Sequence, residues 1–277
     1  MTRKRDKISL WRDNSLPDGL ELLRASCFDY RYPAHFHEEF VIAAFARGAQ
    51  RHRIGRHDGV AGAGSVMIIP PGEVQTAEAA ERDRGWEYCA FYPSARFLES
   101  IADDVLGGCG ELDFGVDLIR HDTSATRHLL RAHAVIASTP DRMEKECAAY
   151  EGFGALIARY GQRSRHGRSS RIIRADMRRA IDYLQTHFAE PVSVGEVAAV
   201  AGLSEYHFMR VFRASTGLSV HRYLTQIRLN RAKSLLSCGV SSAEAAVSVG
   251  LFDQSHLIRH FRQHFGATPG DYAAASR

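Results

Sequence analysis

The sequence predicts two domains, an all-β N-terminal domain followed by helices and an all-α C-terminal domain. Three observations predict this layout. Short apolar runs divided by Gly and Pro turns extend to residue 92, apolar residues at helical spacing follow, and one pattern occurs twice in residues 193–272. The length of 277 residues suits two domains, and 45% hydrophobic residues is an ordinary globular value. We expect domains at 1–160 and 171–277, with a linker at 161–170.

Residues 1–20 are expected to form an arm that packs on the first domain or covers a ligand. The runs that follow, such as 40–46, 66–69 and 86–92, are typical of short strands and favour an antiparallel barrel or sandwich. Two segments resemble the motifs of cupin barrels, and the first domain is therefore predicted to be a cupin-like barrel. These segments are His35-Phe36-His37 with Gly48 downstream, and Gly64 followed by Pro70-Pro71-Gly72-Glu73-Val74-Gln75.

The cupin resemblance also implies where a metal would bind. In metal-binding cupins the first motif supplies two His and a Glu, and the second supplies a further His. Here the Glu position falls near Val41-Ile42, although Glu38 and Glu39 lie close, and the last His position holds Gln75. Two His and an amide are a poor site for a first-row metal. We therefore expect no metal or other cofactor.

Barrel mouths are common ligand sites, where a few polar groups stand within apolar walls. Trp86, Tyr88 and Tyr92 alternate onto one strand face, so they can supply such a wall. In the alternative interpretation these aromatic residues are barrel core and the two histidines lie in a surface loop. The predicted effector site consists of His35, His37, Glu73, Gln75, Trp86 and Tyr88.

After Pro93 the spacing of apolar residues becomes helical, and it predicts amphipathic helices at 126–138 and 142–160. The next ten residues, GQRSRHGRSS, are polar and basic, as expected of a linker. Apolar residues from 173 to 188 then predict a helix that ends before Pro191. This helix begins the second domain.

The second domain contains the same unit twice. Phe212 and Phe261 stand 49 positions apart, as do several flanking pairs, whereas Ser193 and Ser241 stand 48 apart. Both units begin with Ser and with Glu three positions later, which is a capping box, and both have a Gly at the end of the first helix. Each unit is therefore a predicted helix-turn-helix, with a connecting helix at 220–237 of roughly 25 Å.

The second helix of each unit is expected to bury Phe208 and Phe212, or Leu257 and Phe261. Its outward face then offers Arg for guanine, Gln for adenine and apolar groups for the thymine methyl. A single unit of this kind is equally compatible with a plain helical hairpin, but two units favour double-stranded DNA as the partner. The predicted DNA-binding residues are Tyr206, Met209, Arg210, Arg213, Gln254, Ser255, Ile258, Arg259 and Arg262.

Charge is distributed in agreement with this prediction. Residues 161–277 carry 16 Lys and Arg against 8 Asp and Glu, a charge of +8, while residues 1–160 carry 20 against 24, a charge of −4. Together they give the net charge of +4. Positive charge is thus concentrated in the half with the helix-turn-helix units, as phosphate binding requires.

These motifs make residues 171–273 similar to the paired helix-turn-helix domain of AraC/XylS transcription regulators. The resemblance implies a ligand-responsive regulator, more often an activator, with RNA polymerase as a partner and dimerisation through the helices at 126–160. Alternatively, those helices simply pack on the barrel. The matching residues are Ala198, Gly202, Leu203, Ser204, Phe208, Arg210, Phe212, Gly217, Tyr223, Arg228, Ala232, Leu235, Leu236, Ala245, Ala246, Gly250, Leu257, Arg259, Phe261, Gly266, Thr268 and Pro269.

Two other functional classes remain open as alternatives. One is a metal-dependent cupin enzyme fused to a helical domain, but it leaves the second half unexplained, so we expect no enzyme. The other is an effector-independent DNA-binding protein. The five scattered cysteines and the lack of a signal sequence or a bilayer-length apolar run predict a soluble, cytoplasmic protein.

Overall fold

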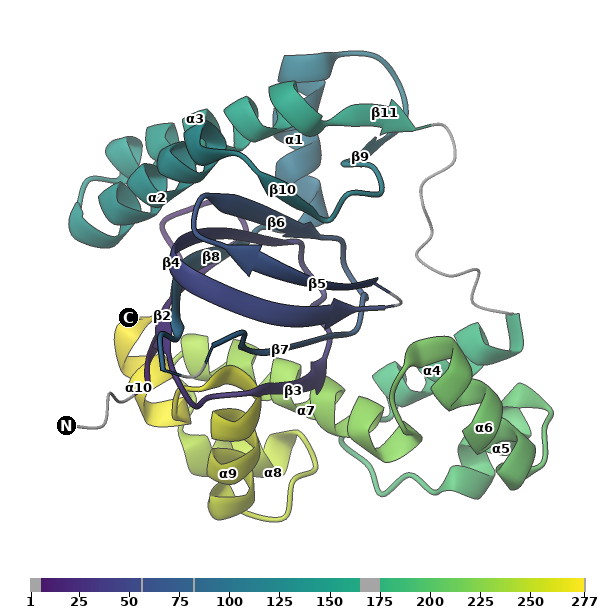
Figure 1. Cartoon of the computed structure of the whole chain (residues 1–277). Coiled ribbons are helices and arrows are strands. Elements are labelled where there is room, and N and C mark those ends of the chain that lie inside the picture. Colours follow the sequence, from purple (N-terminus) through teal and green to yellow (C-terminus); the bar gives the residue numbers. More distant parts are fainter. Residues whose placement is uncertain (1–5, 56, 82, 165–174, 277) are drawn as a thin grey trace.

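The computed structural model describes residues 6–55, 57–81, 83–164 and 175–276, and it confirms a β-rich N-terminal part and a helical C-terminal part (Figure 1). The N-terminal part contains β1 (Lys7–Asp13), β2 (Leu20–Cys27), β3 (Tyr32–His35), β4 (Val41–Ile54), β5 (His57–Gly62), β6 (Ser65–Ile69), β7 (Gln75–Ala79), β8 (Trp86–Tyr92), α1 (Ala95–Leu106), β9 (Glu111–Asp113), β10 (Ile119–His121), α2 (Thr123–Ser138), α3 (Arg142–Tyr160) and β11 (Gln162–Ser164). The C-terminal part contains α4 (Ala175–Thr186), α5 (Val194–Ala201), α6 (Glu205–Thr216), α7 (Val220–Ser237), α8 (Ser242–Ser248), α9 (Gln254–Phe265) and α10 (Pro269–Ala275).

Nine antiparallel strands form the main sheet, in the order β1-β2-β8-β4-β6-β10 with β5, β7 and β3 attached through the second half of β4. The first part of the long strand β4 pairs with β6 and β8, and its second part pairs with β5 and β7. This is possible because the register of β4 shifts between Phe45 and Arg47 and the strand turns at Gly48. Gly48 has φ +65°, and a Cβ there would lie 1.9 Å from the Gly85 carbonyl oxygen. A glycine is therefore required at this bend.

The prediction of a closed cupin-like barrel is wrong, because within the described residues the sheet does not close. At its first edge, β1 meets the C-terminal helix rather than another strand. The Arg12 N–H donates to Ser276 Oγ at 2.9 Å, and the Asn14 side chain donates to the Ser276 carbonyl at 3.4 Å. These contacts cover part of the β1 edge with a helix, where a further strand would be needed to complete a barrel.

The two faces of the sheet pack against different helices because side chains alternate along each strand. Leu22, Ile42 and Phe91 point into a core shared with α1, α2 and α3. Their neighbours, such as Leu23 and Ala90, point to the opposite face, where one continuous core joins the strands to α8, α9 and α10. In Figure 1 the sheet accordingly lies between α1–α3 and α8–α10.

The predicted helices of the first domain are confirmed as α2 and α3, capped by the side chains of Asp122 and Asp141. Strand β11 follows directly and pairs with β9, so the first residues of the expected linker are part of a small sheet. Positions 165–170 of that linker, and the first residues of the helix expected after it, lie outside the described residues. The predicted domain bounds stay a prediction.

The two halves of the C-terminal part are packed differently. Helices α4, α5 and α6 share a core of their own with the first half of α7. In Figure 1 this unit stands to one side of the sheet, while α8–α10 lie against it. The long helix α7 joins the two units, and its bounds are those predicted. None of the helices in the described ranges is both long and apolar enough to cross a membrane.

A buried ion pair lies where α7 meets the sheet. Lys233 Nζ on α7 is 2.7 Å from Glu21 Oε1 on β2, and their side chains are only 4% and 2% exposed. The Tyr272 hydroxyl of α10 donates to Glu21 Oε2 at 2.9 Å. The ammonium also lies 5.1 Å from the centre of the Phe265 ring, within range of a cation–π attraction. One carboxylate thus connects the sheet to two helices of the C-terminal part.

Removing one charge of this pair should be strongly destabilising, since the other charge would stay buried without compensation. We expect Glu21→Gln to lower the free energy of unfolding by about 3 kcal/mol. Urea unfolding at pH 7 measures the change, with Glu38→Gln, an exposed carboxylate, as the control. The double variant Glu21→Gln/Lys233→Met should recover most of the loss. A loss below about 1 kcal/mol in Glu21→Gln would contradict the structural role given to the pair.

Candidate nucleic-acid interface and ligand cavities

The first helix-turn-helix unit is held by local hydrogen bonds that the sequence predicted. Ser193 Oγ accepts from the Glu196 N–H at 3.2 Å, and the Glu196 carboxylate accepts from the Ser193 N–H at 2.7 Å. Gly202 ends α5 in the left-handed conformation at φ +72°. Helix α6 then buries Phe208 and Phe212 completely. The opposite face of α6 is thereby turned to solvent.

The second unit repeats this design. A second capping box opens α8, with Ser241 and Glu244 in the same roles, and the Asp253 side chain caps α9 by accepting from the His256 N–H at 2.7 Å. Leu257 and Phe261 are fully buried. The turn between the helices exposes Phe252, whose side chain is 90% accessible. Sequence analysis did not predict a function for Phe252, although a large apolar residue in a polar turn is an available signal.

All nine predicted DNA-binding side chains are exposed on α6 or α9. Tyr206 is 75% accessible, Met209 44% and Ile258 38%. Arg210 lies near the His207 ring, at 3.5 Å, and remains free to reach outward. The residues are Tyr206, Met209, Arg210 and Arg213 on α6 and Gln254, Ser255, Ile258, Arg259 and Arg262 on α9.

One residue of the N-terminal part borders the outward face of α9. The Tyr30 hydroxyl donates to the carbonyls of Arg262 and Gln263 at 3.0 and 2.9 Å. Tyr30 also lines a hollow of about 520 Å³ together with Ser255, Ile258, Arg259, Arg262 and Gln263. The C-terminal end of α9 is therefore attached to the sheet domain, while its N-terminal end is free.

The predicted ligand-binding residues do not come together in one cavity. His35 and His37 are buried edge-to-face at 5.0 Å, and the cavity that they line with Tyr92 and Phe265 measures only about 10 Å³. Tyr88 donates to the Tyr32 hydroxyl at 2.9 Å inside the core. The histidines are thus buried rather than in a surface loop, and they lie against the helices of the C-terminal part.

The other members of the predicted set lie elsewhere. Gln75 is buried and pairs with His35 across β7 and β3. Trp86 is buried beside a separate hollow of about 680 Å³. Glu73 lines a third cavity, of about 800 Å³. The role of these six residues in ligand binding stays a prediction, and the structure distributes them over three places.

The cavity of about 800 Å³ lies between the end of β4, the 70–74 loop, the start of α1 and residues 110–118. Its apolar wall includes Phe40 and Phe114, whose rings meet edge-to-face at 5.9 Å. Apart from Glu73, none of its lining residues was predicted from the sequence, because they come from five segments without a shared periodic pattern. Within the described residues no three His, Cys, Asp or Glu side chains form a group that could hold a metal.

Comparison with known proteins connects both parts of the chain to one family. The model of the AraC-like ligand binding domain matches residues 19–153, and that of a helix-turn-helix domain matches residues 197–275. The chain belongs to the AraC family of transcriptional regulators. It therefore combines a ligand-binding type of N-terminal domain with a DNA-binding helix-turn-helix domain.

Individual relatives of this AraC-family chain match over most of its length. An uncharacterised helix-turn-helix-type transcriptional regulator of Bacillus subtilis, YbfI, is 26% identical over 86% of each chain. The Msm operon regulatory protein of Streptococcus mutans is 23% identical over 88% of this chain and 87% of its own. The apo form of a ToxT variant from Vibrio cholerae has a similar fold, with a TM-score of 0.59 at 11% identity over 98% and 97% of the two chains.

Because His35 and His37 of this AraC-family protein are buried, they make the stability of its fold depend on pH. It lowers the pKa of His35 to about 4 and lowers that of His37 as well, so both rings are neutral at pH 7. Below pH 6.5 the unfolded chain binds protons that the folded chain does not, so stability must fall as the pH falls toward 4.

For His35 alone the loss between pH 6.5 and 4 should be about 3 kcal/mol. Urea unfolding at several pH values measures this slope in the parent protein and in His35→Gln, which should be less sensitive to acid. His128→Gln, which changes an exposed histidine on α2, serves as the control. An unchanged slope in His35→Gln would show that His35 does not titrate in this way.

Proposed function

We propose that this AraC-family regulator binds a specific DNA site through α6 and α9 and that a small-molecule effector controls it from the N-terminal domain. The observation that carries the proposal is the duplicated unit, in which both second helices bury two apolar residues and expose arginines. Helix α7 joins the two units rigidly, as binding to two successive major grooves requires. The excess of positive charge in residues 161–277 supplies the attraction to phosphate.

Base recognition is assigned to the exposed side chains in the first turns of α6 and α9, because recognition helices contact base edges through their N-terminal residues. Tyr206 and Arg210 lie in the first two turns of α6, and Gln254, Ser255 and Arg259 lie in those of α9. Arg and Gln can each form two hydrogen bonds to one purine. These five residues therefore account best for sequence specificity.

Arg210→Ala and Arg259→Ala should each cost roughly 1–3 kcal/mol on the preferred site and far less on random DNA. Fluorescence anisotropy with a site selected from a random-sequence pool measures both affinities. Arg178→Ala removes an exposed arginine of α4 outside the second helices and should change neither affinity appreciably. Equal losses on both DNAs would assign the two arginines to phosphate contacts instead.

The proposal includes activation of transcription and a contact with RNA polymerase. It is supported by relatives such as the transcriptional activator RhaS of Klebsiella pneumoniae, which is 34% identical over 98 residues, 35% of each chain. That match covers about the length of the helix-turn-helix part. The similarity of the DNA-binding part supports the proposal that this chain activates transcription.

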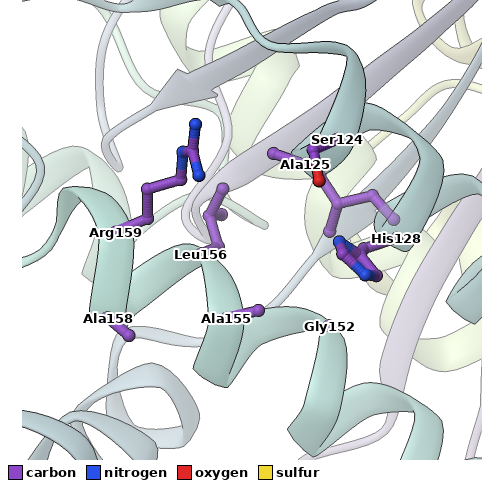
Figure 2. Close-up of a pocket in the computed structure, with 9 residues that line it drawn as sticks. Ser124, Ala125, His128, Gly152, Ala155, Leu156, Ala158 and Arg159 are labelled. Carbon is purple, nitrogen blue, oxygen red and sulfur yellow. The ribbon is translucent and has the colours of Figure 1, made fainter.

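A homodimer is the proposed state, and the groove between α2 and α3 is its proposed contact (Figure 2). The groove measures about 350 Å³, and its rim carries the small exposed residues Ala155 and Ala158. Leu129 and Leu156 form its buried floor. Small residues let a partner helix approach closely. Gly152 of α3 already has this effect on α2, because a Cβ added to Gly152 would lie only 3.2 Å from Ala132 Cβ.

Ala155→Arg should place a long charged side chain on this groove and raise the dissociation constant of the dimer at least tenfold. Size-exclusion chromatography with light scattering at several concentrations measures the effect. Ala137→Arg, at an exposed position of α2 outside the groove, is the matched control. Leu156 is unsuitable for this test because a charge at a buried core position would unfold the domain. A dimer unaffected by Ala155→Arg would exclude this surface.

A further inference from the structure

The cavity of about 800 Å³ has the size and composition of a small-molecule site. We propose that it binds a small organic cation with an apolar body, and that the 70–74 loop transmits its occupancy to the first helix-turn-helix unit. This inference rests on the proposed function, because it names the effector class and the route by which the effector acts.

The charge of the lining selects a cation. Among the described residues of the lining, four carry carboxylates, Glu73, Glu99, Glu111 and Asp113, and one carries a guanidinium, Arg96. Two of the four are already engaged: Glu99 pairs with Arg163 at 2.5 Å, and the Asp113 carboxylate accepts from the Gly115 N–H at 2.9 Å.

The carboxylates of Glu73 and Glu111 have no hydrogen-bond or ion-pair partner in the part of the chain that the structure describes. Glu73 reaches over the β4–β5 turn, where a Cβ added to Gly55 would lie 2.9 Å from its Oε2. Its carboxylate thus stands at the cavity wall rather than in open solvent. An ammonium group of a ligand would pair with the carboxylate of the half-buried Glu73 and would also lie near that of Glu111, which is exposed at the cavity mouth.

The apolar part of the lining suits the body of the same ligand. Ile54, Ile68 and Leu118 form aliphatic walls, and Phe40 and Phe114 present aromatic rings. Aromatic faces attract cations as well as apolar groups, so the phenylalanines and the carboxylates favour the same kind of ligand. An anionic ligand would have to approach two unpaired carboxylates, and Arg96 is the one arginine that the described part of the lining offers it.

The wall of the cavity is also the contact with the first helix-turn-helix unit. Pro70, Pro71 and Glu73 line the cavity, and the next residue, Val74, lies beside Gly217 at the end of α6. A Cβ built on Gly217, which ends α6, would lie 3.5 Å from Val74 Cβ. A displacement of this loop by a ligand therefore reaches the helix that carries Arg210.

A second set of contacts also connects the cavity to α6. The Phe36 ring stacks on Tyr223 of α7 at 4.9 Å, and Tyr223 meets Phe212 of α6 edge-on at 5.4 Å. The Gly72 N–H donates to the His37 carbonyl at 2.8 Å, so the 70–74 loop and the segment that carries Phe36 move together. Both contacts connect the cavity to α6.

The ligand class is tested with octylamine, octanol and octanoate, which share one apolar chain and differ in charge at pH 7. Isothermal titration should show octylamine binding at least tenfold more tightly than octanoate, with octanol between them. Glu73→Gln/Glu111→Gln should weaken octylamine about tenfold and leave octanol unchanged. Asp104→Asn, an exposed carboxylate of α1 outside the lining, is the control. Octanoate binding as tightly as octylamine, or octylamine binding unaffected by the double variant, would overturn the assignment.

The route is tested with Val74→Ala, which leaves the cavity lining intact. On a site selected from random DNA, saturating octylamine should change the affinity of the parent protein at least threefold. In Val74→Ala octylamine should still bind, but the change in DNA affinity that it causes should be less than half of that in the parent protein. Val60→Ala, which changes an exposed valine of β5, should behave as the parent protein does. Failure to bind any selected DNA would refute the proposed function. Normal DNA binding with no response to octylamine, or with an undiminished response in Val74→Ala, would refute this inference alone.

Discussion

The buried ion pair of Glu21 and Lys233 fixes how the two parts of this regulator are arranged. Lys233 lies on α7, the helix shared by both helix-turn-helix units, so holding Lys233 against β2 places the whole DNA-binding part relative to the sheet. Parting the two charges in the interior would leave each without its counter-ion, which is costly. The pair can therefore persist only while the surrounding apolar core stays closed, and that core contains residues from both parts.

This arrangement makes the two units unequal. The second unit shares the core with the sheet and is further attached by Tyr30 at α9 and by Ile8, which packs directly against Gly266. The first unit has its own core and meets the sheet domain through smaller contacts, at Val74 and Phe36. Local motions that require little free energy occur mainly in regions with few buried contacts. The first unit is accordingly the part of the DNA-binding domain that a ligand can move most easily.

The sequence was a good guide wherever short-range chemistry decides the structure. Capping boxes, end glycines and 3.6-residue periodicity lie within a few positions of each other, so the bounds of α7 and the burial of Phe208 and Phe261 followed from them. That the sheet stays open could not be predicted, because the β1 edge is covered by a contact between Arg12 and Ser276, which are 264 positions apart. Alternation likewise showed that Tyr88 points inward, but not that Tyr32 would fill the space beside it.

The contact of Tyr30 with α9 also bears on how the proposed DNA contacts are distributed along that helix. Tyr30 occupies the C-terminal end, where the Arg262 carbonyl accepts its hydroxyl, so a base pair cannot approach this end as closely as it approaches the first turn. Gln254 and Ser255 stand at the free N-terminal end, where backbone N–H groups and helix dipole also favour the negatively charged duplex. We therefore infer that base recognition by α9 is concentrated in its first turns, and that the long side chain of Arg262 reaches back to a phosphate.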